Sequence, residues 1–274
     1  MNIKQTGLIF GFTGAFLCIF PVSRAAASVI ELRDGSSIVK IDPLSQAGLF
    51  TWSVNGINLL PQQWFWFRTG NTAERSIDAM TLDPDSMMTY TLFGDPGPDT
   101  ASWRYTSPGL SLQMDVSLVD ANPTRSLSQV LTWTNTSASP LTLTLFQYVN
   151  FHLGSGSNQI DFNDGASLQT GSGYRAETWV TPFDTRLTGF EAAAVPYTRN
   201  ALNDATSSSF GQSLDSASGD VGAAFEWQAQ VPVTGSFQIS TIENLTAPET
   251  PEPSSAALAI GALAAMFYVR RRRS

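Results

Sequence analysis

Apolar and polar residues alternate with a period of two through much of the chain. The clearest case is Leu110–Leu118, where every second residue is apolar and these side chains would share one face of a strand. The run Leu141–Leu153 starts with the same alternation and then becomes apolar on both faces, which is typical of a central strand. Two later strands are predicted at Ala223–Val231 and Phe237–Ile239. The pattern indicates a protein built mainly from β-strands.

Turn residues separate these runs. Asn55–Gly56 lies between two apolar runs and predicts a hairpin turn, because both residue types tolerate positive φ. No part of the body keeps a 3.6-residue apolar period for three turns, and Pro196–Ala205 favours at most a short helix. The Ser/Gly-rich residues 206–220 predict a long flexible loop. Strands about ten residues apart favour one antiparallel β-sandwich, which we place at residues 28–243.

The N-terminus has the pattern of a secretory signal peptide, which we place at residues 1–27. Lys4 supplies a positive charge, and Leu8–Phe20 is apolar. A small-residue cleavage site follows the apolar stretch, and the alternative is a membrane anchor that is not cleaved. The residues at the predicted cleavage site are Ala25, Ala27 and Ser28.

The C-terminus combines a short stalk, residues 244–253, with a predicted membrane segment, residues 254–274. Ala256–Val269 contains no charged residue and as a helix would be about 21 Å long, which is short for a hydrocarbon core of about 30 Å. Long arginine side chains can extend such a helix to the headgroups, and by the positive-inside rule they stay in the cytoplasm. A buried core helix is the alternative, but it does not account for four adjacent charges. These are Arg270, Arg271, Arg272 and Arg273.

A proline–glutamate–proline motif precedes this apolar segment and arginine cluster, and the three parts in this order resemble the PEP-CTERM sorting signal of Gram-negative bacteria. The resemblance implies that an exosortase recognises the motif, cuts near it and releases or transfers the body. It also implies an association with extracellular polysaccharide. The protein would cross the inner membrane, remain anchored transiently and then reach the cell surface or the medium. The matching motif residues are Pro251, Glu252 and Pro253.

Charge and composition narrow the function further. The chain has 274 residues and a net charge of −8, but six of its 15 basic residues lie in the two terminal segments. All 23 acidic residues lie between Glu31 and Glu252, so the body carries about −14. This charge argues against nucleic acid as a partner and leaves cations, or polysaccharide held through cations, as ligands. The only cysteine, Cys18, lies in the predicted signal peptide, so the mature protein has no disulfide.

The start of the body, Ile30–Gly35 through Phe50–Gly56, resembles galactose-mutarotase-like supersandwiches. The resemblance implies a shared fold. Enzymes of that family use two histidines and an acidic base, whereas His152 is the only histidine in this chain, so the epimerase chemistry is not expected here. A single histidine at the end of an apolar strand is more often structural, and we assign no catalytic residue.

Two groups of residues are candidate ligand sites. Asp161, Asn163 and Asp164 place oxygen atoms beside a turn glycine, which could hold calcium, although the same residues are also ordinary turn formers. Trp64 and Trp66 alternate along one strand and could stack on a sugar ring, although a strand buried on both faces gives the same pattern.

We therefore expect an exported structural or carbohydrate-binding protein, and not an enzyme. The first alternative is a secreted carbohydrate-active enzyme that uses Asp and Glu residues on the same sandwich. The second is a single-pass inner-membrane protein whose tail is never removed.

Overall fold

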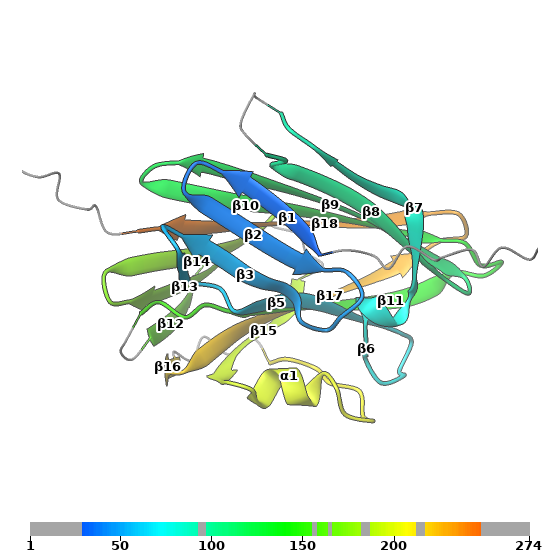
Figure 1. Cartoon of the computed structure of the whole chain (residues 1–274). Helices are drawn as coiled ribbons and strands as arrows, with labels where there is room; N and C mark the ends of the chain where they lie inside the picture. Colours follow the sequence, from blue (N-terminus) through cyan, green and yellow to red (C-terminus); the bar gives the residue numbers. More distant parts are fainter. Residues whose placement is uncertain are drawn as a thin grey trace, which may run out of the picture.

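Two β-sheets packed face to face make up the body of the protein, with one short α-helix on the outer side of one sheet (Figure 1). This is a computed structural model, and the residues that it describes are 29–92, 97–154, 158–163, 166–181, 187–211 and 217–247. Within these ranges, no helix has the length and hydropathy that a membrane span requires. The all-β sandwich predicted from the alternation is confirmed. The cleavage site, the Pro-Glu-Pro motif, the apolar tail and the arginine cluster lie outside the described residues.

Sheet A has nine strands in the order β1-β2-β3-β5-β11-β17-β15, with β4 beside β3 and β6 beside β5. Every pairing is antiparallel except that of β3 with β5, which is parallel. This exception to the predicted antiparallel sandwich arises because the chain reverses twice between the two strands, once into β4 and once out of it. The strands are β1 (Ile30–Asp34), β2 (Ser37–Asp42), β3 (Gly48–Val54), β4 (Ile57–Asn58), β5 (Gln62–Thr69), β6 (Arg75–Ser76), β11 (Leu141–Asn150), β15 (Leu187–Ala194) and β17 (Val221–Val231).

Sheet B also has nine strands, in the order β16-β12-β13-β14-β18-β10-β9-β8-β7, and all of its pairings are antiparallel. The last strand of the fold, β18, lies inside this sheet between β14 and β10. The strands are β7 (Thr81–Tyr90), β8 (Thr100–Ser107), β9 (Leu110–Ala121), β10 (Thr124–Asn135), β12 (Asn158–Asn163), β13 (Ala166–Gly171), β14 (Tyr174–Thr181), β16 (Ala217–Gly219) and β18 (Ser236–Thr246). The helices are the 3-10 turn η1 (Ile77–Ala79) and α1 (Tyr197–Ala201).

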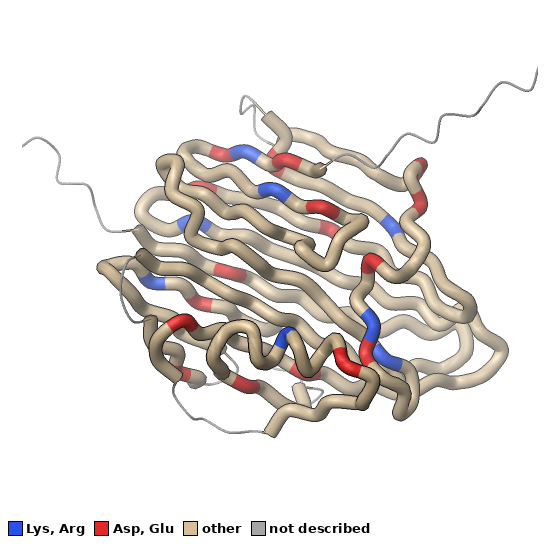
Figure 2. Tube along the Cα trace, turned by 60° about the horizontal axis from the view of Figure 1, so that its bottom comes forward, with Lys and Arg blue, Asp and Glu red and all other residues tan. Residues whose placement is uncertain are grey.

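The period-two pattern places side chains as predicted. The apolar positions of β9 are at most 3% exposed from Leu110 to Leu118, and the polar positions between them are partly exposed. The hairpin turn between β3 and β4 has Asn55 at φ 51° and Gly56 at φ 81°, which is the left-handed conformation expected of this pair. Charged positions are scattered along the chain in both sheets, and acidic ones outnumber basic ones (Figure 2).

The core lies between the two sheets and is rich in aromatic rings. Phe67 of sheet A packs on Trp133 of sheet B with ring centroids 5.1 Å apart, and Trp52 lies 6.4 Å from Phe151. Aromatic side chains of this size contribute large buried apolar areas, and in a chain without a predicted disulfide such burial is the main source of stability.

A layer of polar side chains interrupts this core. Glu243 of β18 is fully buried and accepts hydrogen bonds from Gln129 Nε2 at 3.0 Å and Gln147 Nε2 at 2.7 Å. Gln129 also donates to Gln63 Oε1 at 3.1 Å, so the layer joins the two sheets. Burial raises the pKa of Glu243 to about 7, even though these hydrogen bonds favour the charged form.

Candidate functional site

The outer face of sheet A, which points away from sheet B, carries a row of aromatic side chains. Trp64 lies opposite Tyr148, and Trp66 lies opposite Phe146, on the adjacent strands β5 and β11. On the next strand, the small residue Gly222 gives the ring of Tyr148 its space, since a Cβ there would lie 2.9 Å from the tyrosine hydroxyl. β5 is apolar on both faces because its inner side packs in the core and its outer side is also covered.

Residues 195–211, which we call the cover segment, lie over this outer face and include α1 (Figure 1). Phe210 packs edge-on against Phe146 with ring centroids 5.4 Å apart, and Asn203 Oδ1 accepts a hydrogen bond from Trp66 Nε1 at 3.0 Å. The backbone of the cover segment approaches sheet A closely at Gly189, where a Cβ would lie 2.4 Å from the carbonyl oxygen of Phe210. The part of this segment at 206–211, predicted as a flexible loop, is therefore packed on the sheet.

The two tryptophans considered as sugar contacts are fully buried. Trp64 and Trp66 are each 0% exposed, and Trp64 Nε1 donates to Asp78 Oδ1 of η1 at 3.2 Å. This burial agrees with the alternative interpretation of the pattern, a strand covered on both sides. A sugar could stack on either indole only if the cover segment moved.

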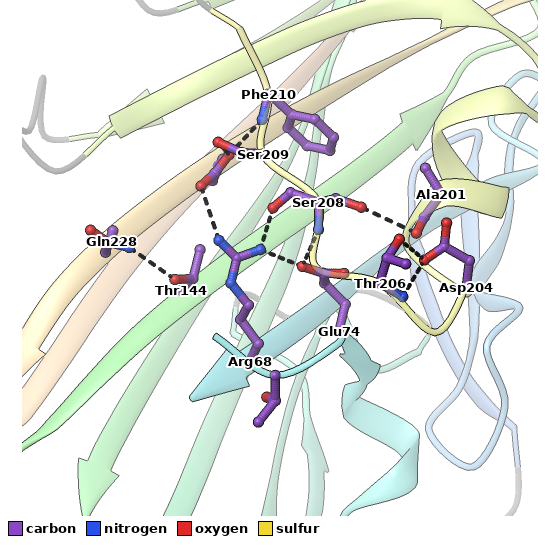
Figure 3. Close-up of polar contacts among 12 residues, drawn as sticks. Arg68, Glu74, Thr144, Ala201, Asp204, Thr206, Ser208, Ser209, Phe210 and Gln228 are labelled. Atoms are coloured by element: carbon purple, nitrogen blue, oxygen red, sulfur yellow. Dashed lines mark hydrogen bonds and ion pairs between the residues drawn. The ribbon is translucent and has the colours of Figure 1, made fainter. Parts of the chain in front are cut away.

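A buried charge cluster fixes the cover segment to the sheet (Figure 3). Arg68 at the end of β5 contacts Glu74 and the carbonyl oxygen of Ser208, and its Nη2 lies 3.8 Å from Glu226 Oε1. The two carboxylates also accept backbone hydrogen bonds from the segment, Glu74 from the amide of Ser208 at 2.9 Å and Glu226 from the amide of Phe210 at 2.7 Å. All three charged side chains are at most 9% exposed.

Burial affects both the pKa values and the stability of this charge cluster. Burial raises the pKa of Glu226, and the amide of Phe210 and the guanidinium of Arg68 oppose that rise. Removing one member of such a buried pair leaves an uncompensated charge, which typically costs about 3–5 kcal/mol. As folded, the cluster therefore holds the cover segment in place, and its carboxylates are committed to that contact.

Beside α1 the surface is hollowed into a groove of about 460 Å³, which we call the α1 groove. Three hydrogen bonds join its walls, from Arg199 Nη1 to Gln62 Oε1 at 2.7 Å, from Gln46 Nε2 to Asn203 Oδ1 at 2.7 Å, and from Gln62 Nε2 to the Gln46 carbonyl at 3.1 Å. The groove is open and polar, with four side-chain amides and one guanidinium. Its lining residues are Gln46, Ala47, Pro61, Gln62, Arg199, Asn200 and Asn203.

The groove adjoins the covered aromatic face. Asn203 belongs to the groove and also binds the indole nitrogen of Trp66. Burial raises the pKa of Tyr148 to about 12, and the positive charge of Arg199 opposes the rise, which indicates that the guanidinium lies near this phenol. The α1 groove is therefore open to solvent and lies next to the buried aromatic face of sheet A.

The other residues singled out from the sequence lie elsewhere. His152 follows β11, is exposed, and uses its backbone amide to bind the Leu59 carbonyl at 2.8 Å. Asp161 accepts hydrogen bonds from Gln159 Nε2 at 3.2 and 3.3 Å, whereas Asp164 and the side chain of Asn163 lie outside the described residues, so the calcium site stays a prediction. Among the described residues, no group of three or more His, Cys, Asp or Glu side chains could hold a metal ion.

The site residues that sequence reasoning missed carry a recognisable signal. Glu226 is a single charge inside the apolar run Ala223–Trp227, and Arg68 directly follows four aromatic residues. A charge inside a strand buried on both faces needs a buried partner. Arg199 gave no such signal, because it lies in a short polar stretch.

Comparisons with known proteins show similarity in fold only. No family model matches the chain, and no curated protein matches it in sequence. A bacterial glucoamylase solved with acarbose is similar over 82% of this chain, with a TM-score of 0.54 and 9% identity. This chain spans 32% of the length of that glucoamylase.

Two smaller proteins are also similar in structure. A protein of Escherichia coli K12 assigned as an aldose 1-epimerase matches over 80% of this chain and 98% of its own, with a TM-score of 0.46 and 10% identity. A galactose mutarotase-like protein of Lactobacillus casei ATCC 334 matches over 80% of this chain and 100% of its own, with a TM-score of 0.37 and 8% identity. The glucoamylase similarity shows that the chain shares a β-sandwich fold with part of that enzyme.

Proposed function

We propose that this protein recognises carbohydrate in the α1 groove. The observation that carries the proposal is the chemistry of the lining, where the side-chain amides of Gln46, Gln62, Asn200 and Asn203 surround one arginine in an open hollow. Amide groups both donate and accept hydrogen bonds, which suits the hydroxyl groups of a sugar. Such a polar lining differs from the mainly apolar lining of most small-molecule pockets.

An enzymatic role has more support than the structural role that we expected first. The glucoamylase is a sugar-processing enzyme, and this chain shares the fold of about a third of it. Within the charge cluster under the cover segment, Glu226 is the carboxyl group suited to hold a proton, because burial raises its pKa and it lies beside a second carboxylate, Glu74, on one guanidinium. For such a group to reach a glycosidic oxygen, the cover segment would have to open.

Binding is tested with the purified protein and a panel of neutral and acidic oligosaccharides, by titration calorimetry. We expect Gln62→Ala to weaken binding about fivefold, since a lost hydrogen bond is worth about 1 kcal/mol. Gln238→Ala is the matched control, because Gln238 is an exposed amide on sheet B that donates to Thr132 at 3.0 Å. If no oligosaccharide binds, or if both variants behave alike, the groove is not a carbohydrate site.

Turnover is tested on the same panel by measuring reducing-sugar release and the interconversion of anomers. If the protein is an enzyme, Glu226→Gln abolishes turnover and leaves ligand binding in place, whereas Glu177→Gln, on the partly exposed strand β14, has no effect. Circular dichroism verifies that both variants are folded. Binding without turnover would identify a binding protein instead.

The location of the protein is a separate proposal that rests on the two terminal segments. An exosortase would recognise Pro251, Glu252 and Pro253 while the arginine cluster holds the tail in the inner membrane, and the body would then reach the cell surface or the medium. The mass of the protein recovered outside the cell tests this order of events. We expect loss of residues 1–27 and of everything beyond the Pro-Glu-Pro region. A mass that still includes Ser274 would refute the sorting proposal.

A further inference from the structure

Arg199 differs from most arginines of this protein in its surroundings. Arg33, Arg68, Arg104, Arg125 and Arg175 each contact a carboxylate. Within the described part of the chain, Arg199 forms no ion pair, and its Nη1 donates a hydrogen bond to a neutral amide oxygen, Gln62 Oε1, at 2.7 Å. A guanidinium has five N–H donors, so most of its capacity for hydrogen bonds is free for a ligand.

Among the described residues that line the groove around this arginine, none is acidic, although the protein as a whole is acidic. Its lining consists of amides, one proline and one alanine beside Arg199, whereas the chain carries a net charge of −8. Next to Gln62 across the strand pair lies Asn150, which is 9% exposed and whose Oδ1 has no hydrogen-bond partner among the described residues. The groove therefore offers an unpaired positive charge among neutral polar groups.

We propose that the α1 groove selects an acidic sugar residue, a uronate, whose carboxylate pairs with Arg199. The flat guanidinium can bind a carboxylate through two parallel hydrogen bonds, and the amides of Gln46 and Asn200 remain for the ring hydroxyls. This inference rests on the proposed carbohydrate function and names the class of sugar.

The negative charge of the body limits the length of such a ligand. The chain carries a net charge of −8, so long-range repulsion from the whole body opposes each additional carboxylate of a polyuronate. One acidic residue at the groove gains the local attraction of Arg199 and avoids most of this repulsion. The site therefore favours a short or terminal uronate over a continuous polyuronate.

The test compares digalacturonate with its neutral, carboxyl-reduced counterpart by titration calorimetry on the purified protein at low and physiological salt. We expect digalacturonate to bind at least about tenfold more tightly, because hydrogen bonds between charged groups are about twice as strong as neutral ones. Higher salt should reduce this preference. Arg199→Gln should remove the preference, whereas Arg199→Lys, which keeps the charge and loses the planar fork, should keep part of it.

Arg175→Gln is the matched control, since Arg175 is an exposed arginine on sheet B that pairs with Glu177. Equal binding of the two sugars by the unmodified protein would overturn the selection for uronates and leave the carbohydrate proposal standing. The same conclusion would follow if Arg199→Gln weakened both sugars equally. Absence of binding by either sugar, and by every oligosaccharide of the panel, would overturn both proposals. Thermal unfolding of each variant separates loss of the site from loss of the fold.

Discussion

Replacing the buried carboxyl group of Glu243 with an amide should make the protein more stable at neutral pH. Glu243 lies between the sheets, where two glutamine side chains donate to it and no cation faces it among the described residues. Glu243→Gln removes the charge and keeps the size of the side chain. The oxygens Gln129 Oε1 and Gln147 Oε1 have no hydrogen-bond partner among the described residues, so rotation of these amides would let them accept from the new amide group.

The size of the effect follows from the two pKa values. Burial raises the pKa of Glu243 from 4.5 to about 7, and each unit corresponds to 1.36 kcal/mol, so the full effect is about 3 kcal/mol. Because the folded state keeps its proton to a higher pH, the stabilisation is complete below pH 4.5 and is lost as the pH rises through about 7. The glutamine variant has no such loss. It should therefore match the unmodified protein near pH 4 and exceed it by about 3 kcal/mol near pH 8.

Urea unfolding of both proteins at a series of pH values measures this difference. Other groups also titrate between pH 4 and 8, but their contributions cancel when the two free energies of unfolding are subtracted at each pH. Glu31→Gln serves as a control of opposite sign, because, against the effect of burial, Lys40 and Arg33 lower the pKa of Glu31, so this variant should lose stability relative to the unmodified protein as the pH rises. A difference between Glu243→Gln and the unmodified protein that does not change with pH would show that this carboxyl group does not titrate as the reasoning requires.

Three further substitutions test the packing. Gly48→Ala should destabilise the protein by about 1–3 kcal/mol or more in urea unfolding, because Gly48 has φ +55° and a Cβ would lie 2.1 Å from Cε3 of Trp64. Phe210→Ala removes a buried ring from the cover segment, and we expect faster proteolytic cleavage within residues 195–211 with a smaller change in global unfolding. Asp120→Asn removes the negative charge that lies 3.0 Å from Nε of the buried Arg125, which should cost about 3 kcal/mol in urea unfolding.

Two matched variants should destabilise the protein less. Gly56→Ala has positive φ but open space around the new Cβ, so its cost should be the smaller of the two glycine changes. Asp83→Asn breaks an exposed pair with Arg104 and should cost less than about 1 kcal/mol. Equal effects within either pair, or an unchanged cleavage rate for Phe210→Ala, would contradict the contacts described.

The fold follows from the sequence wherever one face of a strand meets the core and the other meets solvent. The regular period of two at Leu110–Leu118 fixed both the strand and its buried face, and the Asn55–Gly56 turn followed from the φ angles that these residues tolerate. The parallel contact of β3 with β5 could not be foreseen, because it depends on how the chain returns after the two-residue strand β4.

The candidate site was harder to predict because its residues meet only in the folded protein. Arg68 and Glu226 are distant in sequence. The Ser/Gly-rich composition of residues 206–211 predicts a loop but does not predict which residues the loop contacts. Buried charges hold this stretch to the sheet, and a local sequence pattern does not identify the distant partner of a buried charge. Because the cover segment lies over this face, Trp64 and Trp66 are buried and are not the exposed ligand contacts considered from the sequence.

The position of β18 has a mechanical consequence. This strand ends the described fold at Thr246, and it is paired with β10 from Ser236 to Thr246 on one side and with β14 from Ser240 to Thr246 on the other. A pull on the chain beyond Thr246, along the strand axis, would stretch both ladders in shear, so that many hydrogen bonds share the force at once. Peeling an edge strand breaks its bonds one after another at a lower force. A body held by its C-terminal end would thus resist extraction by flow or drag through its most firmly paired strand.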